Sequence, residues 1–415
     1  MGGAAFRPPE SGMDFEESYD VIVSGAGIAG VAAALASARA GLKTALVEKT
    51  VFTGGLATAG LINIYLPICD GNGTQVTFGI AEELLHLSIR YGPGDVPAGW
   101  RGGKDAAEEA RYRVVFSPAS FVLALDEALE AAGVEIMLDT RVARPVTESG
   151  AVTGLEVENV SGRGLLSAPV VVDATGDASV AHRAGCHCEL GGNWQSMWAL
   201  GASLERAREA AASGDGTGLT RTLRLGVPEA GGVTGGATET FIRAAEVTRF
   251  VLDGRRGLRE YYREKHAAGG DTGRRNLYPL TLPAMPQLRT IRRIAGRESL
   301  TDGRHATRFR SSIGLVADWR KPGFVWEVPY GTMLPGGGAP TGLLVAGRCI
   351  GSGGDAWEVM RVIPACALTG EAAGVAAAVA VREGKPPDEI DPAAVQARMR
   401  ELGVPVHLDE VGLGA

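Results

Sequence analysis

Residues 19–30 read YDVIVSGAGIAG, and this stretch decides the fold. An apolar strand runs directly into a glycine turn, and an Ala-rich helix predicted over 28–40 follows at once. A second strand is predicted over 44–47, which completes a β-α-β unit of the length that a parallel crossover needs. The fold class expected from this unit is α/β, with a Rossmann-like nucleotide domain.

The three glycines of GAGIAG have distinct physical roles in a dinucleotide site. Gly25 permits a tight turn, Gly27 lets the backbone approach a pyrophosphate, and Gly30 lets the helix pack on the strand. The helix N-terminus faces the phosphate charge. Glu48 ends the second strand and is placed to accept hydrogen bonds from ribose hydroxyls. Because strand, turn, helix and acid occur together, the segment predicts a bound dinucleotide rather than a bare glycine turn.

The hydrophobic pattern further along the chain predicts the remaining elements and the domain organisation. Helices are expected over 81–91, 117–132, 204–212, 239–266 and 363–382, and strands over 134–138, 142–146, 152–159, in APVVVDATG (168–176) and in LLVAG (343–347). The predicted domains are a flexible leader over 1–18, the nucleotide domain over 19–190 and 336–383, an inserted α+β substrate domain over 191–335, and a C-terminal tail over 384–415.

Composition restricts the class of protein. The chain has 415 residues, 60 glycines and a net charge of −7, which offers no field for nucleic acid or an anionic membrane. We find no basic stretch followed by an apolar one at the N-terminus and expect no membrane span, so a cytoplasmic protein is expected. The five cysteines are few and uneven in number, so no disulfide scaffold is expected. The spacing of Cys186-His187-Cys188 does not match a zinc-binding pattern, so no metal is expected.

Other segments choose between NAD and FAD. EKTVFTGGLATAG (48–60), VVVDATGDASVAHRAG (170–185) and LLVAGRCIGSGGDAWEVMRVIPACALTGEAAGVAAAVA (343–380) resemble the FAD-dependent oxidoreductases of the glutathione-reductase-like superfamily. They are similar in particular to the bacterial group related in architecture to the flavoprotein subunit of fumarate reductase. LRTIRRIAGRESLT (288–301) and VPYGTMLP (328–335) extend the resemblance over most of the chain. It implies FAD as cofactor and an FAD-binding domain of the glutathione-reductase type.

Carried over position by position, the resemblance implies a set of FAD-binding residues along the whole cofactor. From the ADP moiety to the flavin they are Gly25, Ala26, Gly27, Ile28, Ala29, Gly30, Glu48, Lys49, Gly54, Gly55, Val142, Ala174, Thr175, Gly176, Asp177, Gly347, Arg348, Asp355, Ile363 and Ala367. The final helix would aim its N-terminal dipole at the flavin edge. Alternatively, the small residues of this helix only allow it to pack closely against its neighbours.

Catalytic residues are harder to predict, because a flavin carries out the electron chemistry itself. Arg361 resembles the family's arginine and is expected either to stabilise reduced flavin or a substrate carboxylate, or to form a supporting ion pair. Histidines common in the family are replaced by Gly354 and Trp357, so Trp357 is expected to stack on the substrate or cover the flavin. Tyr330 is expected to be either an acid or base near the flavin or a core tyrosine with a satisfied hydroxyl.

Arg289 and Arg292, within the basic run of LRTIRRI, are candidates for binding an anionic substrate, although such a run is more often salt-bridged or solvated.

The leading function is a dehydrogenase or oxidase that takes a hydride from a small organic substrate, because no second strand-glycine-helix unit is present for NAD(P)H. One alternative is a monooxygenase or halogenase that needs an external reductant, since GFVWEVP is similar to a halogenase motif. Another is a non-catalytic flavoprotein. A homo-oligomer remains open by analogy.

Overall fold

A five-stranded parallel sheet forms the centre of the computed structural model, which describes residues 12–96, 113–226 and 239–414. The strand order is β18-β10-β2-β3-β6, and all neighbouring pairs are parallel. The strands are β2 (Val21–Ser24), β3 (Thr44–Val47), β6 (Glu135–Met137), β10 (Val170–Asp173) and β18 (Leu343–Val345). Every residue of β2, β3, β10 and β18 is buried, as expected for strands covered on both faces. The predicted α/β class is confirmed.

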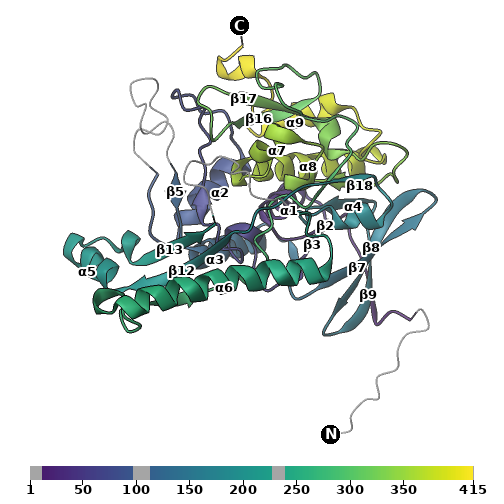
Figure 1. The fold of residues 1–415 in the computed structure, drawn as a ribbon. Helices are drawn as coiled ribbons and strands as arrows, with labels where there is room; N and C mark the ends of the chain where they lie inside the picture. Colours follow the sequence, from purple (N-terminus) through teal and green to yellow (C-terminus); the bar gives the residue numbers. More distant parts are fainter. Residues whose placement is uncertain (1–11, 97–112, 227–238, 415) are drawn as a thin grey trace.

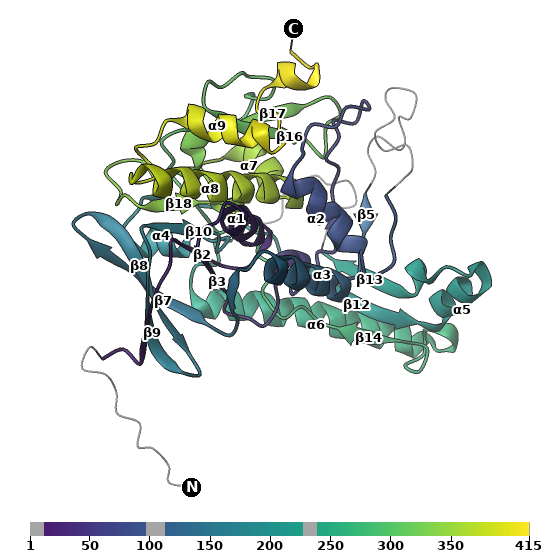
Figure 2. The ribbon, with the colours of Figure 1, turned by 180° about the vertical axis from the view of Figure 1, so that it is seen from behind.

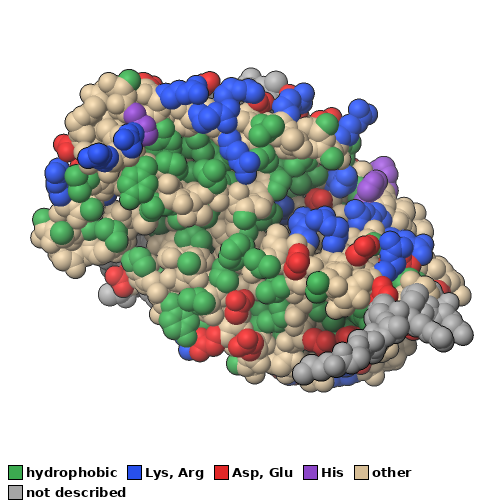
Figure 3. All heavy atoms as spheres, turned by 90° about the horizontal axis from the view of Figure 1, so that it is seen from below, with side chains coloured by type: hydrophobic (Ala, Val, Ile, Leu, Met, Phe, Trp, Pro, Cys, Tyr) green, Lys and Arg blue, Asp and Glu red, His purple; other side chains and the backbone are tan. Residues whose placement is uncertain are grey.

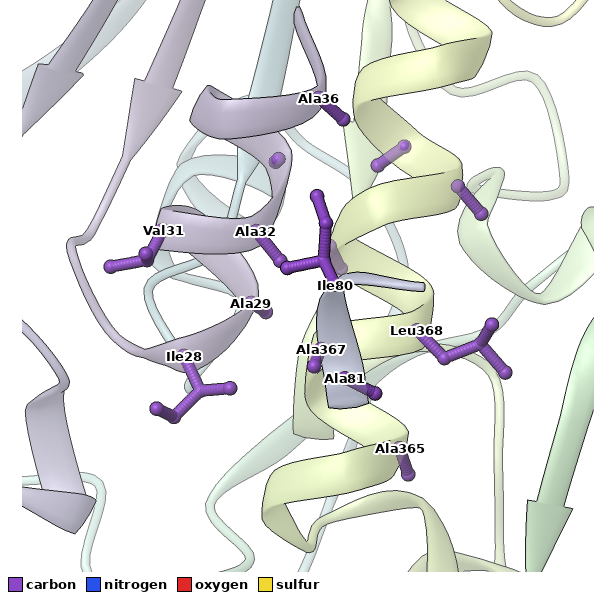
Figure 4. Close-up of a cluster of buried hydrophobic side chains, with 14 of the residues drawn as sticks. Ile28, Ala29, Val31, Ala32, Ala36, Ile80, Ala81, Ala365, Ala367 and Leu368 are labelled. Atoms are coloured by element: carbon purple, nitrogen blue, oxygen red, sulfur yellow. The ribbon is translucent and has the colours of Figure 1, made fainter. Parts of the chain in front are cut away.

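One face of the sheet is covered by two helices in close contact, α1 (Ile28–Arg39) and α8 (Ile363–Glu383). Figure 2 shows them lying side by side. A Cβ added at Gly370 would clash with the carbonyl oxygen of Ala29, and one at Gly374 would lie 2.5 Å from that of Ala33. In Figure 4, alanines of both helices meet Ile80 and Ala81 of a third helix. Along this part of α8, the small residues therefore serve close packing.

The composition of α8 corrects the expectation that the chain contains no candidate membrane span. By length and hydropathy alone, Ile363–Glu383 is apolar enough to cross a membrane, but 83% of its apolar window is buried inside the structure. Packing against α1 and α2 (Ile80–Ile89) accounts for the apolar composition.

The other face carries a four-stranded sheet of order β1-β9-β8-β7, visible beside the central sheet in Figures 1 and 2. It comprises β1 (Phe15–Ser18), β7 (Arg141–Glu148), β8 (Ala151–Asn159) and β9 (Gly162–Ser167). The antiparallel part is the predicted meander. Strand β1 corrects the predicted leader, because Phe15–Ser18 pairs in parallel with β9 instead of being flexible. Residues 1–11 of that leader lie outside the described residues.

A second unit is built on an antiparallel sheet of order β13-β12-β14. Its elements are β12 (Met197–Ser203), α5 (Leu204–Ser213), β13 (Thr220–Leu225), α6 (Ala244–Ala268) and β14 (Leu277–Thr281). The long helix α6 runs along this sheet (Figure 1) and buries Leu258 and Tyr262 against Met197. Seen from below, the molecule gathers hydrophobic side chains over the middle of the face, with basic side chains above them (Figure 3).

The predicted substrate domain over 191–335 is not one unit. Strands β16 (Ser312–Ala317) and β17 (Val325–Pro329) contribute Ile313, Trp326 and Val328 to the main core around α8. Helix α9 (Pro392–Glu401) buries Val395 and Met399 in the same core, so much of the C-terminal tail is packed as well.

Shorter elements connect these units. They are β4 (Ile64–Tyr65), β5 (Val114–Val115), α3 (Pro118–Ala131), α4 (Ser179–Arg183), β11 (Cys188–Leu190), β15 (Arg292–Ile294), α7 (Gly354–Met360) and the single-turn helices η1 (Gly55–Ala57), η4 (Gly216–Gly218), η5 (Gly270–Thr272), η6 (Tyr330–Met333), η7 (Gly347–Cys349) and η8 (Leu408–Val411).

Candidate functional site

A cavity of about 720 Å³ opens at the carboxyl ends of β2, β10 and β18, where ligands bind in open α/β sheets. Most of the predicted cofactor residues converge on it. Its lining contains Gly25, Gly27, Ile28, Ala29, Glu48, Lys49, Gly54, Gly55, Ala174, Thr175, Gly176, Gly347, Arg348, Arg361 and Ile363, together with Leu56, Ala57, Met285, Ala346 and Cys366.

The glycine turn leaves room for a ligand along the backbone. Gly25 has a φ of +97°, and a Cβ there would lie 2.8 Å from the carbonyl oxygen of Ala174. A Cβ at Gly30 would fall well inside van der Waals contact with the carbonyl oxygen of Gly25. At Gly27, in contrast, a Cβ would meet no atom within 4 Å. The turn is therefore closed on its protein side and open on its cavity side, as a bound pyrophosphate requires.

Glu48 sits where the cavity meets a second hollow of about 670 Å³. One carboxylate oxygen accepts from the backbone N–H of Ala26 at 2.8 Å, and the other accepts from that of Thr50 at 2.9 Å. The Thr50 hydroxyl donates to the same Oε1 atom as the Thr50 N–H, at 2.9 Å, so the carboxylate is fixed and Oε2 keeps acceptor capacity for a ribose hydroxyl. Val142 and Asp177 line the second hollow, so the predicted adenine end lies beyond Glu48.

The opposite end of the cavity is electropositive. Ile363, the first residue of α8, lines it, and the N-cap residue Val362 has no side-chain cap, so the positive end of the helix dipole faces the cavity. Arg361 lies beside this helix end, with its Nε donating to Glu358 at 3.0 Å. The supporting ion pair expected of Arg361 is present, and Arg361 also lines the cavity; its role toward reduced flavin or a substrate carboxylate stays a prediction. An elongated cavity with a glycine-lined backbone, a fixed acid and a helix N-terminus fits FAD.

Comparison with known proteins agrees with this geometry. The chain matches the family model described as FAD dependent oxidoreductase over residues 20–208 and 203–399. The chain belongs to this family. It is an FAD-dependent oxidoreductase, which confirms the predicted cofactor and the prediction that the protein is an enzyme.

Individual relatives match over shorter stretches. L-aspartate oxidase from Mycobacterium tuberculosis is 32% identical over 199 residues, which are 40% of this chain and 37% of that protein. Thioredoxin reductase from Ureaplasma parvum is 35% identical over 74 residues, 18% of this chain and 24% of that protein. The alignments thus span well under half of these curated relatives. A geranylgeranyl bacteriochlorophyll reductase-like structure from Thermoplasma acidophilum aligns over 93% of this chain and 83% of its own, with 14% identity and a TM-score of 0.46.

Two residues predicted to bind FAD lie elsewhere in this flavoprotein. Asp355 forms ion pairs with Arg320 at 2.8 Å and Lys321 at 2.5 Å, and these bonds lower the pKa of its carboxyl group. It does not line the cavity. Ala367 is fully buried and faces neighbouring helices in the core (Figure 4). Ion pairing at the surface and helix packing account for these two side chains, and a contact of either with FAD stays a prediction.

Two predicted catalytic residues also lie outside the cavity lining. The Tyr330 hydroxyl donates to the carbonyl of Pro387 at 2.7 Å, and burial raises the pKa of the phenol well above its ordinary value. Tyr330 is thus a core tyrosine rather than an acid or base. The Trp357 indole donates to the carbonyl of Arg348 at 2.6 Å and packs against Gly191, so it supports Arg348 and does not cover the flavin cavity.

The family histidine position at Gly354 is closed by the backbone. Gly354 has a φ of +56°, and a Cβ there would clash with the carboxylate of Asp302. The left-handed backbone favours glycine at this point, and a larger side chain would also have to displace the Asp302 carboxylate.

The arginines of LRTIRRI have different surroundings. Arg292 lines a hollow of about 770 Å³ next to the cofactor cavity and lies 3.8 Å from the Asp177 carboxylate. Arg293 pairs with Glu189 at 2.5 Å. Arg289 is the exception, since its buried Nε and Nη2 have no hydrogen-bond partner. Its guanidinium carbon lies 5.7 Å from the ring centroid of Trp194 and 5.4 Å from that of Trp198.

Sequence reasoning missed three residues that shape the site. Met285 lines the cofactor cavity and two neighbouring hollows. Gln287 bridges the loop after Gly60 to β12, donating to the Gly60 carbonyl at 2.5 Å and accepting from the Trp198 N–H at 2.8 Å. Asn193 accepts from the backbone N–H groups of residues 289 and 290. No motif marks these residues, because each acts through partners distant in sequence.

Proposed function

We propose that this flavoprotein is a dehydrogenase or oxidase that removes a hydride from a small organic substrate. The observation that carries the proposal is the single dinucleotide cradle. GxGxxG spacing occurs once in the sequence, at Gly25–Gly30, and the cradle built on it is the one that fits FAD. Since no second unit of this kind is encoded, we expect the electrons to come from a substrate that enters beside the cofactor rather than from a stably bound NAD(P)H.

The residues of the cavity bind, orient and exclude water. Glu48 and the glycine turn hold the ADP end, while Arg361 and the N-terminus of α8 supply positive potential at the other end. Met285 separates the cavity from the hollows beside it. When bound, FAD supplies the hydride acceptor. We propose that the domain holding it is of the glutathione-reductase type, which the parallel sheet, the glycine turn and the antiparallel β7–β8–β9 meander support.

The test is anaerobic reduction of the purified FAD-loaded protein, followed by visible absorbance. A panel of small organic acids, amines and alcohols is added in one series, and NADH or NADPH alone in another. The expected result is that a member of the panel bleaches the flavin band and the nicotinamides do not. Rapid bleaching by NADPH alone, or incorporation of labelled oxygen into a product, would replace the proposal with a monooxygenase.

A further inference from the structure

We propose that the substrate carries a carboxylate and that Arg289 binds it between Trp194 and Trp198. The inference rests on the proposed function in one respect, namely that the compound bearing this carboxylate is the one oxidised beside the flavin. It concerns four N–H groups of three adjacent side chains, which we call the donor cluster: Arg289 Nε and Nη2, Trp194 Nε1 and Trp198 Nε1.

The donor cluster is unusual because all four N–H groups are buried and none has an acceptor. A buried polar group without a hydrogen bond is costly, and buried charges are normally paired. Every member is a donor, and neither an indole nor a guanidinium can accept. A ligand that satisfies the cluster must therefore bring acceptor atoms, and it must bring negative charge if it is to neutralise the guanidinium.

Neighbouring arginines show that the missing partner is specific to Arg289. Arg292 faces Asp177, Arg293 pairs with Glu189, and Arg361 pairs with Glu358. Among the described residues, Arg289 alone of these four has no acid in ion-pair distance. The segment LRTIRRI thus contains two arginines that face acidic side chains, Arg292 and Arg293, and one that does not, Arg289.

The backbone around Arg289 is held rigidly, as a binding residue requires. The Asn193 side chain accepts from the N–H groups of Arg289 at 2.6 Å and Thr290 at 3.0 Å, and it donates to the Thr290 carbonyl at 2.6 Å. On the other side, the carbonyl of Leu288 accepts from Arg348, which lines the cofactor cavity. Arg289 is thereby attached to the wall of that cavity.

The electrostatic surroundings favour an anion. Burial, together with the positive charges of Arg361, Arg348 and Arg224, lowers the pKa of Arg289 to about 9, against the opposing effect of Glu358. The group remains protonated at neutral pH. Because three of the four charged neighbours are cationic, the fold supplies too little negative charge for this guanidinium, and an anionic ligand would supply the rest.

The free edge of the guanidinium selects the kind of anion. Nε and Nη2 form one side of the planar fork, which matches the two oxygens of a carboxylate in a bidentate bond. The rings of Trp194 and Trp198 lie against the guanidinium, and Arg224 stacks on Trp198 at 4.5 Å, so a second cation adjoins the cluster. Trp194 is partly exposed, and turning its side chain breaks no hydrogen bond because its indole N–H has none, so the cluster has a route of entry.

The experiment measures binding by titration calorimetry to the oxidised, FAD-loaded protein, without turnover. The probes are acetate and benzoate, with benzamide as the uncharged match and phenylphosphonate as the phosphorus-based anion. We expect a carboxylate to bind and to quench tryptophan fluorescence, and benzamide to bind at least about tenfold more weakly. Arg289→Met should weaken the carboxylate at least about tenfold, whereas Arg289→Lys should retain part of the affinity.

A second readout separates binding from a structural role. Because the guanidinium has no partner to lose, the ligand-free Arg289→Met protein should have a Tm equal to or above that of the wild type. Arg293→Gln is the matched control, which removes an arginine already paired with Glu189 and should leave carboxylate binding unchanged.

Three outcomes would overturn the inference: no binding of acetate or benzoate to the wild type, tighter binding of benzamide or phenylphosphonate, or a lower Tm with unchanged binding in Arg289→Met. None of these depends on turnover. Failure of the proposed function would appear instead in the bleaching experiment, even if carboxylates bind.

Discussion

The dinucleotide end of the flavin cavity is lined by backbone, whereas the donor cluster, which lies outside the cavity lining and is joined to it through Leu288 and Arg348, forms a second end of the site built from long side chains. At the first end, Gly25, Gly27 and Gly30 bring the main chain to the ligand, and a Cβ is tolerated only at Gly27. At the second end, Arg289, Trp194 and Trp198 carry the recognition chemistry, and their polar groups lack partners within the described structure. The glycine turn is packed without its ligand, whereas the N–H groups of the donor cluster have no hydrogen-bond acceptor without one.

This difference predicts how each end responds to change. The backbone end is part of the core, so a substitution there disturbs folding and cofactor binding together. The side-chain end carries unmet polar groups, so a substitution there alters recognition while leaving the cofactor in place. The following predictions test that division, from the largest expected effect to the smallest.

Gly30→Ala should have the largest effect. The new Cβ would collide with the Gly25 carbonyl oxygen, and neither backbone segment has room to move because both belong to the core. We expect the free energy of unfolding to fall by about 3 kcal/mol or more. FAD should be lost as well, as measured by flavin absorbance per protein and by thermal unfolding.

Gly218→Ala is the control for Gly30→Ala, because a Cβ there meets no atom within 4 Å. It should change stability by no more than about 0.5 kcal/mol. A Gly30→Ala protein that keeps its FAD and the Tm of the wild type would contradict the claim that substitutions in the glycine turn disturb folding and cofactor binding together.

Asn193→Ala should come next and should affect the side-chain end. It removes two acceptor bonds and one donor bond to the buried backbone at Arg289 and Thr290. We expect a stability loss of about 2–3 kcal/mol. Benzoate affinity should fall while the FAD-to-protein ratio stays at the wild-type value.

Asn276→Ala is the matched variant, because it removes one exposed bond to the Gly270 carbonyl. It should lower stability only slightly and leave benzoate binding intact. If Asn193→Ala lost FAD in proportion to its stability, the two ends of the cavity would not be separable.

Glu371, a buried carboxyl group of α8 outside the cavity lining, should make the free energy of unfolding depend on pH. Burial, with a smaller contribution from Glu83, raises the pKa of this α8 carboxyl to about 7, although the hydrogen bond from the Ile80 N–H and the charge of Arg39 oppose the shift. A raised folded pKa means that the native state holds the proton more tightly, so stability is lost as pH rises from about 4.5 through 7. Denaturant unfolding at pH 5 and pH 8 should show a loss of about 2 kcal/mol. Glu371→Gln should remove this loss, and an equal pH dependence in the variant would refute the assignment.

Tyr330→Phe should have the smallest effect. The variant loses one hydroxyl bond to the Pro387 carbonyl, for an expected cost of about 1 kcal/mol. The rate at which substrate bleaches the flavin should not change in stopped-flow measurements. A tenfold slower rate at unchanged stability would return Tyr330 to a catalytic role.

Local sequence patterns were sufficient where neighbouring residues along the chain meet in space. The strand over 44–47 lies at the predicted residues, and the helices predicted over 28–40 and 363–382 are offset by one residue at their ends. Periodicity and glycine position specify these elements because their partners are a few residues away. The failures have one common cause. Asp355 and Ala367 were carried over from the family resemblance, and their actual partners come from segments far along the chain.

By itself, the sequence determined the parallel α/β unit, the glycine turn at Gly25–Gly30 and the acid that follows it, because backbone conformation and helix dipoles act locally. The resemblance of later segments added FAD. Only the tertiary structure decided which arginine of LRTIRRI is left without a partner, because Asp177 and Glu189 reach Arg292 and Arg293 from separate elements. Whether a charge is neutralised depends on what folding brings within a few ångströms, and no spacing along the chain encodes that distance.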